Sequence, residues 1–169
     1  MHYDVIVIGA GSMGMSSGYY LSKNGQKVLL LDSFAPPHNK GSHHGETRII
    51  RHAYGEGREY VSLALKSQKL WGELERISGQ QLFLPTGVLN AGSQNSTFIK
   101  QVKAGSKEYG LPMNILDYHE IHDRWPGITL PEDYIGCYES TSGVLKSEEC
   151  IKRVSTTCEI PWCRHHCKQ

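Results

Sequence analysis

The stretch from Gly41 to Tyr60, GSHHGETRIIRHAYGEGREY, is rich in side chains that can do chemistry. It holds three histidines, three arginines and three glutamates. A guanidinium binds a carboxylate through two parallel, charge-assisted hydrogen bonds, and an imidazole can transfer protons near neutral pH. The stretch therefore has the groups needed to recognise an anion. The alternative is that its arginines pair with Glu46, Glu56 or Glu59 on a solvated surface, as exposed charges commonly do.

The conformation of this stretch decides which of its side chains can act together. In a helix, Arg48 and Arg51 would share one face with His44 and His52. In a strand, the two arginines would point to opposite sides. The apolar residues do not alternate cleanly enough to choose, so both conformations stay open.

Upstream of this stretch, the opening MHYDVIVIGAGSMG predicts a strand that runs into a glycine-rich turn. The strand covers Val5 to Ile8, and a helical pattern follows from Met15 through Ser22. A second apolar strand, KVLLLD, then closes on Asp32. Strand, turn, helix, strand and terminal acid together form the dinucleotide-binding fingerprint, whose glycines are Gly9, Gly11 and Gly14. The sequence thus predicts an α/β fold built on a Rossmann-like βαβ unit with a parallel sheet.

The fingerprint also predicts how a nucleotide would bind. The glycines permit a tight turn and close approach of a pyrophosphate, while the helix N-terminus offers unpaired N–H groups. The carboxylate of Asp32 would receive the ribose hydroxyls and would repel a 2′-phosphate. These residues favour FAD or NAD over NADP.

Beyond the first sixty residues the patterns predict further helices and strands. An amphipathic helix is expected from Tyr60 to Ser78, and two short strands from Leu82 to Asn90 around Pro85-Thr86-Gly87. A helix is expected from Thr97 to Tyr109, and Asp117 with Glu120 forms a capping box for a short helix. His119 and His122 have a spacing seen in zinc sites, but without further ligands they are interpreted as surface residues.

Composition limits the classes of function. The chain has 169 residues and a formal net charge of +1, so neither nucleic acid nor a membrane surface is an expected partner. The apolar run from Val5 to Ile8 is too short for a secretory or membrane-spanning segment. A cytoplasmic protein that binds small molecules is expected. Of the five cysteines, Cys137 and Cys150 are interpreted as small buried thiols.

Several separated motifs occur in the order found in one known family. The segments GSHHGETRIIRHAYGEGREY, IVIGAGSMGMSSGYYL, PPH, RWPGI and SGVL closely resemble the monomeric sarcosine oxidase and N-methyltryptophan oxidase family of flavoproteins. The resemblance runs from about Tyr3 to about Arg153. It implies a monomer that binds FAD and oxidises secondary amino acids such as sarcosine, with O2 as the electron acceptor and H2O2 as a product.

The resemblance also implies roles for individual residues. The cofactor-binding residues it implies are Gly9, Gly11, Ser12, Met13, Gly14, Asp32, Ser42, His43, Arg48 and Ile49. His44, Arg48 and Arg51 match residues of the active-site wall and are the expected catalytic residues. Arg51, Tyr54 and Glu56 are the expected substrate-binding residues, with Arg51 holding the substrate carboxylate. No metal site is expected.

By the same resemblance, residues 1–80 would begin the FAD-binding domain and residues 81–153 a mixed-sheet substrate domain. Residues 154–169 are expected to be an aberrant, unstructured tail, although Cys158, Cys163, His165, His166 and Cys167 leave a zinc site as the alternative. The family is longer, and its flavin-linking cysteine and oxygen-activating lysine find no match here. A truncated chain that folds poorly and has little activity is therefore expected.

Two other functions stay open at this point. A nicotinamide-dependent dehydrogenase could use the same fingerprint, and a non-enzymatic nucleotide-binding remnant would need none of the arginines.

Overall fold

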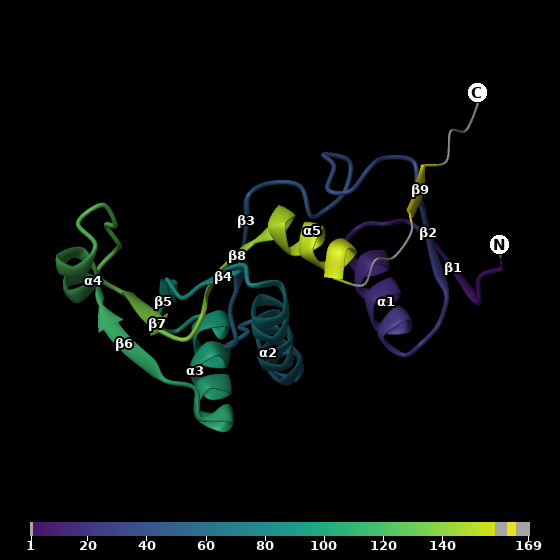
Figure 1. The fold of residues 1–169 in the computed structure, drawn as a ribbon. Helices are drawn as coiled ribbons and strands as arrows, with labels where there is room; N and C mark the ends of the chain where they lie inside the picture. The colour runs from purple at the N-terminus through teal and green to yellow at the C-terminus, as the bar shows by residue number, and fades with distance from the viewer. Residues whose placement is uncertain (1, 158–161, 165–169) are drawn as a thin grey trace. The chain divides into compact units, whose positions relative to one another are not determined.

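The computed structural model describes residues 2–157 and 162–164 (Figure 1). The chain forms two compact units, each made of separate segments. The first unit comprises Met1–Arg48, Trp71–Leu82 and Leu145–Gln169, and the second comprises Ile49–Leu70 and Phe83–Val144. The contiguous division into residues 1–80 and 81–153 does not coincide with these units, and it stays a prediction.

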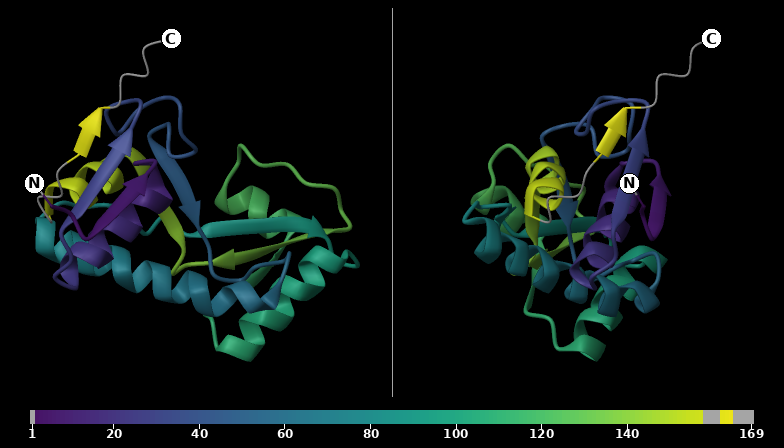
Figure 2. Two further views of the ribbon diagram at one scale, coloured as in Figure 1. Left: turned by 90° about the vertical axis from the view of Figure 1, so that its right-hand side faces the viewer. Right: turned by 45° about the vertical axis from the view of Figure 1, so that its right-hand side comes forward.

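The first unit contains a parallel sheet of order β1-β2-β9. Strand β1 (Val5–Ile8) pairs with β2 (Val28–Asp32), and β9 (Trp162–Arg164) pairs with the other edge of β2. Helix α1 (Ser12–Lys23) makes the crossover between β1 and β2 and packs beside α5 (Ser147–Thr157), as Figures 1 and 2 show. The predicted α/β fold with a βαβ unit and a parallel sheet is confirmed.

Helix α1 is longer than the sequence pattern predicts because it starts directly after Gly11. That residue is the N-cap and has an extended backbone. The helix ends at Asn24, and the following Gly25 has a positive φ of 84°, which glycine adopts without steric cost. Met15 of α1 and Leu30 of β2 are both buried, which places the core of this unit under the helix.

The second unit contains an antiparallel sheet of order β5-β7-β6. Its strands are β5 (Val88–Ser93), β6 (Met113–Asp117) and β7 (Tyr134–Glu139). Helix α3 (Thr97–Tyr109) packs against β5 and β7, and its buried Ile99 and Val102 form a core with Ala53 and Cys137. The helix ends at Gly110, whose φ is +62°.

Short helix α4 (Tyr118–Arg124) begins with the predicted capping box. The Asp117 carboxylate accepts the Glu120 N–H at 2.8 Å, and the Glu120 carboxylate accepts the Asp117 N–H at 2.8 Å. Each residue thereby satisfies an N–H group that the helix itself leaves unpaired.

A third sheet has the order β3-β8-β4, from β3 (Thr47–Ile50), β8 (Gly143–Lys146) and β4 (Phe83–Leu84). Arg48 therefore lies in a strand, which settles the question left open by the sequence. The two strands predicted between Leu82 and Asn90 exist, but they join different sheets instead of pairing with each other.

Helix α2 (Val61–Ser78) follows a short 3₁₀ turn (Arg58–Tyr60), and it ends before Gly79, whose φ is +65°. This agrees with the predicted helix from Tyr60 to Ser78. Among the described residues, no helix combines the length and apolar character needed to cross a bilayer.

The thiols of Cys137 and Cys150 are free and buried, as predicted. Burial raises the pKa of Cys137, and it raises the pKa of Cys150 to about 12. Of the predicted tail, residues 154–157 complete α5 and 162–164 form β9. The remaining tail residues, and the side chains proposed as zinc ligands, lie outside the described part of the chain.

Candidate functional site

The glycine-rich turn of the first unit brings the end of β1 into close contact with the start of α1. Gly9 has a φ of +99°, a conformation that favours glycine. A Cβ on Gly14 would lie 1.7 Å from the carbonyl oxygen of Gly9, so only glycine allows this approach. At Gly11 a Cβ would meet nothing closer than His43 Nδ1, at 3.9 Å. The turn thus leaves open space above Gly11 at the N-terminus of α1.

The N-terminus of α1 has no side-chain cap. Its first N–H groups are therefore available to an anion, and the positive end of the helix dipole favours one. Ser12 and Met13 form the first turn of this helix, and Met13 is exposed.

Asp32, at the end of β2, lies beside the same turn. Its carboxylate accepts the Ala10 N–H at 2.7 Å and the Phe34 N–H at 2.9 Å. Burial raises the pKa of Asp32, but these hydrogen bonds and the neighbouring His38 outweigh it, so the net pKa lies below 3.8. The residue is a fixed carboxylate at neutral pH, as binding of ribose hydroxyls requires.

His38 and His43 pack together near this carboxylate. Their ring centroids are 5.0 Å apart, and His38 Nε2 lies 3.5 Å from an Asp32 carboxylate oxygen. The His38 N–H donates to His43 Nε2 at 3.2 Å. Burial lowers the pKa of His43 below 6.5, and His38 adds to the effect, so the ring is neutral and carries its proton on Nδ1.

The Nδ1 donor of His43 is buried and has no hydrogen-bond partner. It is also the atom nearest to a Cβ built on Gly11. A buried donor beside an uncapped helix N-terminus fits the phosphate part of a dinucleotide cofactor. The residues present in the first unit therefore fit FAD.

Arg48 organises the loop that carries Ser42, His43 and His44. Its guanidinium donates to the carbonyl oxygens of Thr47 at 2.7 Å, Ser42 at 2.6 Å and His44 at 2.6 Å. The cation is thus held by backbone carbonyl groups, and within the described part of the chain it forms no ion pair with a carboxylate. The alternative in which the arginines pair with Glu46, Glu56 or Glu59 therefore does not hold for Arg48.

The first turn of α5 braces the same loop from the other side. The Ser147 hydroxyl donates to the His43 carbonyl at 2.8 Å. The Glu148 carboxylate accepts the Gly45 N–H at 3.1 Å and lies 3.3 Å from His44 Nδ1. The Gly45 N–H and His44 lower the pKa of Glu148. His44 is therefore an exposed, carboxylate-paired histidine.

Arg51 belongs to the second unit and has a different environment. Its guanidinium pairs with Glu56 and donates to Asn90 Oδ1 at 3.4 Å. It also lies over the Tyr54 ring, with 5.0 Å from Cζ to the ring centroid. Because Arg51 pairs with Glu56, the alternative in which the arginines pair with glutamates on a solvated surface holds in part for this residue. Ile49, two positions earlier, is 68% exposed.

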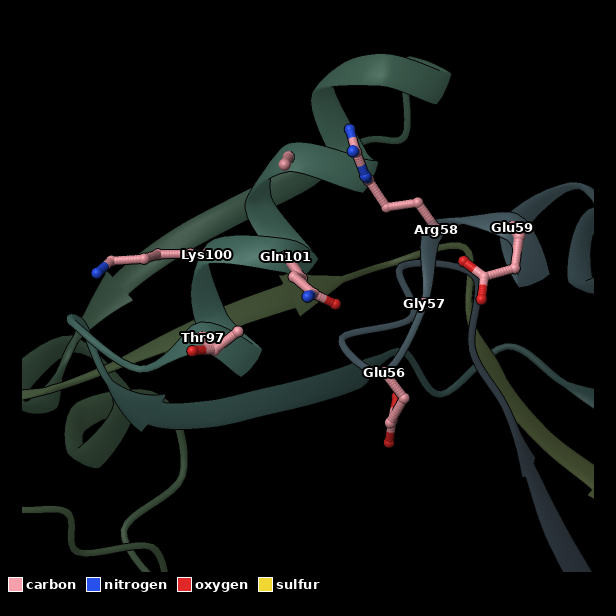
Figure 3. A pocket seen from close by; sticks show the side chains of 8 residues that line it. Glu56, Gly57, Arg58, Glu59, Thr97, Lys100 and Gln101 are labelled. Carbon is pink, nitrogen blue, oxygen red and sulfur yellow. The ribbon is translucent and has the colours of Figure 1, made fainter.

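Glu56 also borders a pocket of about 530 Å³ in the second unit (Figure 3). The loop after Gly55 forms one side, and the first turns of α3 form the other. The pocket is lined by Glu56, Gly57, Arg58, Glu59, Thr97, Lys100, Gln101 and Ala104. Acidic and basic side chains thus share this surface, and Glu56 alone belongs to the predicted site residues.

A buried polar cluster in the second unit includes His52, the residue that follows Arg51. Glu139 at the end of β7 is fully buried, as are His52 and Ser142. The carboxylate accepts the N–H of Ala53 at 3.0 Å and the Ser142 hydroxyl at 2.5 Å, and it lies 2.5 Å from His52 Nδ1. Burial raises the pKa of Glu139, but hydrogen bonds from His52, Ser142 and Ala53 outweigh it, so the net pKa is below 4.5.

The lowered pKa of Glu139 predicts a pH-dependent contribution to stability. A carboxyl with a folded pKa below its unfolded value stabilises the fold above the unfolded pKa. That contribution is fully present above about pH 4.5 and is lost as the pH falls through the lower, folded pKa. We expect the free energy of unfolding to fall with acid by at most about 1.4 kcal/mol per pH unit from this group.

Urea unfolding at a series of pH values checks this. Glu139→Gln is expected to be less stable at pH 7 and to have a shallower pH dependence in the acid range. Glu132→Gln, at an exposed position of the same unit, is the control. Equal acid slopes in the wild type and Glu139→Gln would contradict the prediction.

Five polar residues beside the predicted site residues could not be identified from the sequence: His38, Asn90, Glu139, Ser147 and Glu148. The PPH motif contains His38, but its contact with Asp32 depends on the loop path. Asn90 is a polar residue at the end of a predicted strand, and only the structure shows that it is buried. Among residues 2–154, whose side chains the structure describes, no three or more His, Cys, Asp and Glu side chains gather as a metal site would require.

Comparison with known proteins identifies relatives of this chain. The chain is 57% identical over 152 residues to the monomeric sarcosine oxidase of Bacillus sp. (strain B-0618). It is 50% identical over 152 residues to the N-methyl-L-tryptophan oxidase of Yersinia pestis (strain Pestoides F). These matches cover 89% and 90% of this chain but 39% and 41% of the two relatives. The chain thus spans about two fifths of the length of these relatives.

Solved structures show the same fold. NikD, described as an unusual amino acid oxidase essential for nikkomycin biosynthesis, matches with a TM-score of 0.83 at 22% identity, covering 95% of this chain and 42% of NikD. L-proline dehydrogenase from P. horikoshii matches with a TM-score of 0.78 at 20% identity, covering 93% and 41% of the two chains. At these identities the likeness concerns the fold alone.

The family model described as FAD dependent oxidoreductase matches residues 4–159, which includes the glycine-rich turn, Asp32 and both arginines. The chain belongs to the FAD-dependent oxidoreductase family.

Proposed function

We propose that the gene product containing this chain is an FAD-dependent oxidase of secondary N-methyl amino acids. The observation that carries the proposal is Arg51, a fixed guanidinium in the second unit, in a chain whose first unit fits FAD. The relatives named sarcosine oxidase and N-methyl-L-tryptophan oxidase support this substrate class.

In this proposal the glycine-rich turn, Asp32 and the residues from Ser42 to Ile49 hold the cofactor. Gly9, Gly11 and Gly14 allow the approach of the pyrophosphate, the N–H groups of Ser12 and Met13 face it, and Asp32 accepts the ribose hydroxyls. Ser42, His43, Arg48 and Ile49 are assigned to the remaining cofactor contacts. Bound FAD would supply the two-electron oxidation: the N-methyl carbon of the substrate would lose a hydride equivalent, O2 would be reduced to H2O2, and the imine product would hydrolyse to formaldehyde and the primary amino acid.

The chain's own residues bind and orient the substrate. Arg51 is assigned to the substrate carboxylate, because its planar guanidinium can form two charge-assisted hydrogen bonds with it. Tyr54 and Glu56 border that position, since both contact the guanidinium. Arg48 supplies a fixed positive charge, and His44 is assigned to proton transfer, with Glu148 as its partner.

Purification of the full-length gene product and an assay with sarcosine and N-methyltryptophan test the proposal. We expect a yellow protein that consumes O2 and releases H2O2 with either amine. Dimethylamine, which has no carboxylate, is the matched control and should react poorly. A colourless protein that turns over only with a nicotinamide cofactor would instead support a dehydrogenase.

A monomer in the cytoplasm completes the proposal. The name of the sarcosine oxidase relative supports a monomer. The free, buried thiols of Cys137 and Cys150 are consistent with a reducing compartment. Size-exclusion chromatography and cell fractionation test these two points.

Asp32 offers a direct test of cofactor binding. Because the carboxylate is assigned to the ribose hydroxyls, we expect Asp32→Asn to weaken FAD binding by roughly tenfold to a hundredfold, as for lost hydrogen bonds to a charged group. Fluorescence titration of the apoprotein with FAD measures the effect.

Asp4→Asn is the matched control for this experiment. The Asp4 carboxylate also accepts a backbone N–H, from Lys27 at 2.8 Å, but it is not part of the glycine-rich turn. We expect its FAD affinity to equal that of the wild type. Equal affinities for Asp4→Asn and Asp32→Asn would contradict the role assigned to Asp32.

A further inference from the structure

The buried carboxylate of Glu139 has an unusual set of hydrogen-bond donors. Four donor groups surround it: the backbone N–H groups of His52 and Ala53, His52 Nδ1 and the Ser142 hydroxyl. A buried carboxylate is tolerated when its lone pairs are all satisfied, and this set achieves that. A well-packed apolar residue would often stabilise a core as well as a buried ion pair does. The stability of the fold alone therefore does not explain why a charged carboxylate is buried at Glu139.

Two of these donors lie directly after Arg51 in the chain. Strand β3 ends at Ile50, so the N–H groups of residues 52 and 53 extend beyond the ladder of that strand. The Glu139 carboxylate accepts the His52 N–H at 3.2 Å and the Ala53 N–H at 3.0 Å. The carboxylate thus accepts the backbone N–H groups that carbonyl groups of a neighbouring strand would accept in a sheet. Glu139 thus determines the backbone path at the residues that follow Arg51.

The other end of Arg51 is held by different groups. Its guanidinium contacts Glu56, Asn90 and the Tyr54 ring. Arg51 and Glu56 are partly exposed, whereas Glu139 is fully buried. The backbone anchor is therefore the rigid end of this arrangement, and a shift there would displace the guanidinium.

We propose that Glu139 is a positioning residue for Arg51, which it orients toward a substrate carboxylate through the backbone of His52 and Ala53. This inference rests on the proposed function, because it takes Arg51 as the carboxylate-binding group. Glu139 itself touches neither substrate nor cofactor. Its effect is to keep the arginine in place before the substrate arrives.

The carboxylate is suited to this role in a way that an amide is not. A carboxylate only accepts hydrogen bonds, and it has enough lone pairs for all of the donors around it. In Glu139→Gln, the amide oxygen would be the single acceptor for these four donors, and the NH2 group would face either the Ala53 N–H or the Ser142 hydroxyl and His52 Nδ1. The His52 N–H lies within reach of both carboxylate oxygens, at 3.2 and 3.3 Å, so the hydrogen bonds to the backbone after Arg51 would have to rearrange around one oxygen. The size and shape of the side chain are otherwise retained.

The experiment compares Glu139→Gln with the wild type in the full-length gene product carrying FAD. We expect KM for sarcosine to rise about tenfold with kcat changed less than about twofold, as for the loss of uniform substrate binding. With sarcosinamide, which has no carboxylate, kcat/KM should be the same for both proteins. Hydrogen exchange at the amides of residues 52 and 53 should be faster in the variant.

Ile121→Val separates positioning from general destabilisation. Ile121 is fully buried in α4 of the same unit, and its shortening loosens the core without touching the hydrogen bonds of Glu139. We expect a lower Tm with an unchanged KM for sarcosine. If Glu139→Gln does not fold, Ser142→Ala removes one donor to the carboxylate and should raise KM by about threefold in the same carboxylate-specific manner.

The outcomes distinguish this inference from the proposed function. A wild type without oxidase activity would contradict the proposed function and this inference with it. An active wild type would overturn this inference alone if Glu139→Gln kept its KM for sarcosine. Equal losses with sarcosine and sarcosinamide would also overturn it, since they would indicate a structural defect.

Discussion

Replacement of Arg51 by alanine is expected to reduce kcat/KM for an N-methyl amino acid by roughly 10- to 150-fold, equivalent to about 1.5–3 kcal/mol of lost charge-assisted hydrogen bonding. Most of the loss should appear in KM, because the carboxylate is present in both the bound substrate and the transition state. Steady-state kinetics of the full-length gene product measure both parameters.

Arg58→Ala is the matched control for this prediction. Arg58 follows Arg51 by seven residues, is 57% exposed, and pairs with Glu108 at 2.9 Å. Exposed ion pairs of this kind contribute little, so we expect near wild-type kinetics. If Arg51→Ala behaved like Arg58→Ala, pairing with Glu56 would be the whole role of Arg51.

The second large effect is expected from Gly14→Ala. A Cβ at this position would lie 1.7 Å from the Gly9 carbonyl oxygen and 2.9 Å from its carbonyl carbon. Both atoms belong to the backbone, so the start of α1 must move away from the turn. We expect a loss of about 1–3 kcal/mol or more in unfolding free energy, as for overpacked sites, together with the loss of bound flavin. Thermal unfolding and the flavin-to-protein absorbance ratio measure the two effects.

Gly72→Ala is expected to stabilise the fold, in contrast to Gly14→Ala. Gly72 lies within α2, and a Cβ there would meet no atom within 4 Å. Alanine is favoured over glycine in a helix interior, so a gain of about 0.5–1 kcal/mol is expected. A Gly14→Ala protein with wild-type Tm and flavin content would show that the close approach at Gly9 is not required.

Local signals made the first βαβ unit predictable. Strand β1, helix α1 and strand β2 follow from apolar runs, from glycine at the turn and from Asn24-Gly25 at the helix end. The capping box at Asp117 and the helix end at Gly110 are equally local. Each of these features depends on residues a few positions apart, which is the range over which sequence patterns carry information.

Pairings between distant residues could not be predicted in the same way. The stretch around Arg48 forms a strand because β8 pairs with it, and no residue near Arg48 encodes that partner. Glu139 and His52 are 87 positions apart, and Asn90 and Arg51 are 39 positions apart. A sequence shows that a glutamate or an asparagine is present, but its burial depends on the sheets that enclose it.

The bracing of the His43 loop by α5 has a consequence for how the protein is made. Ser147 and Glu148 reach the loop across 104 and 103 positions of the chain. A nascent polypeptide leaves the ribosome from its N-terminus, so the glycine-rich turn emerges long before these two residues. Tight retention of flavin should therefore not arise before the helix that steadies the loop has been synthesised.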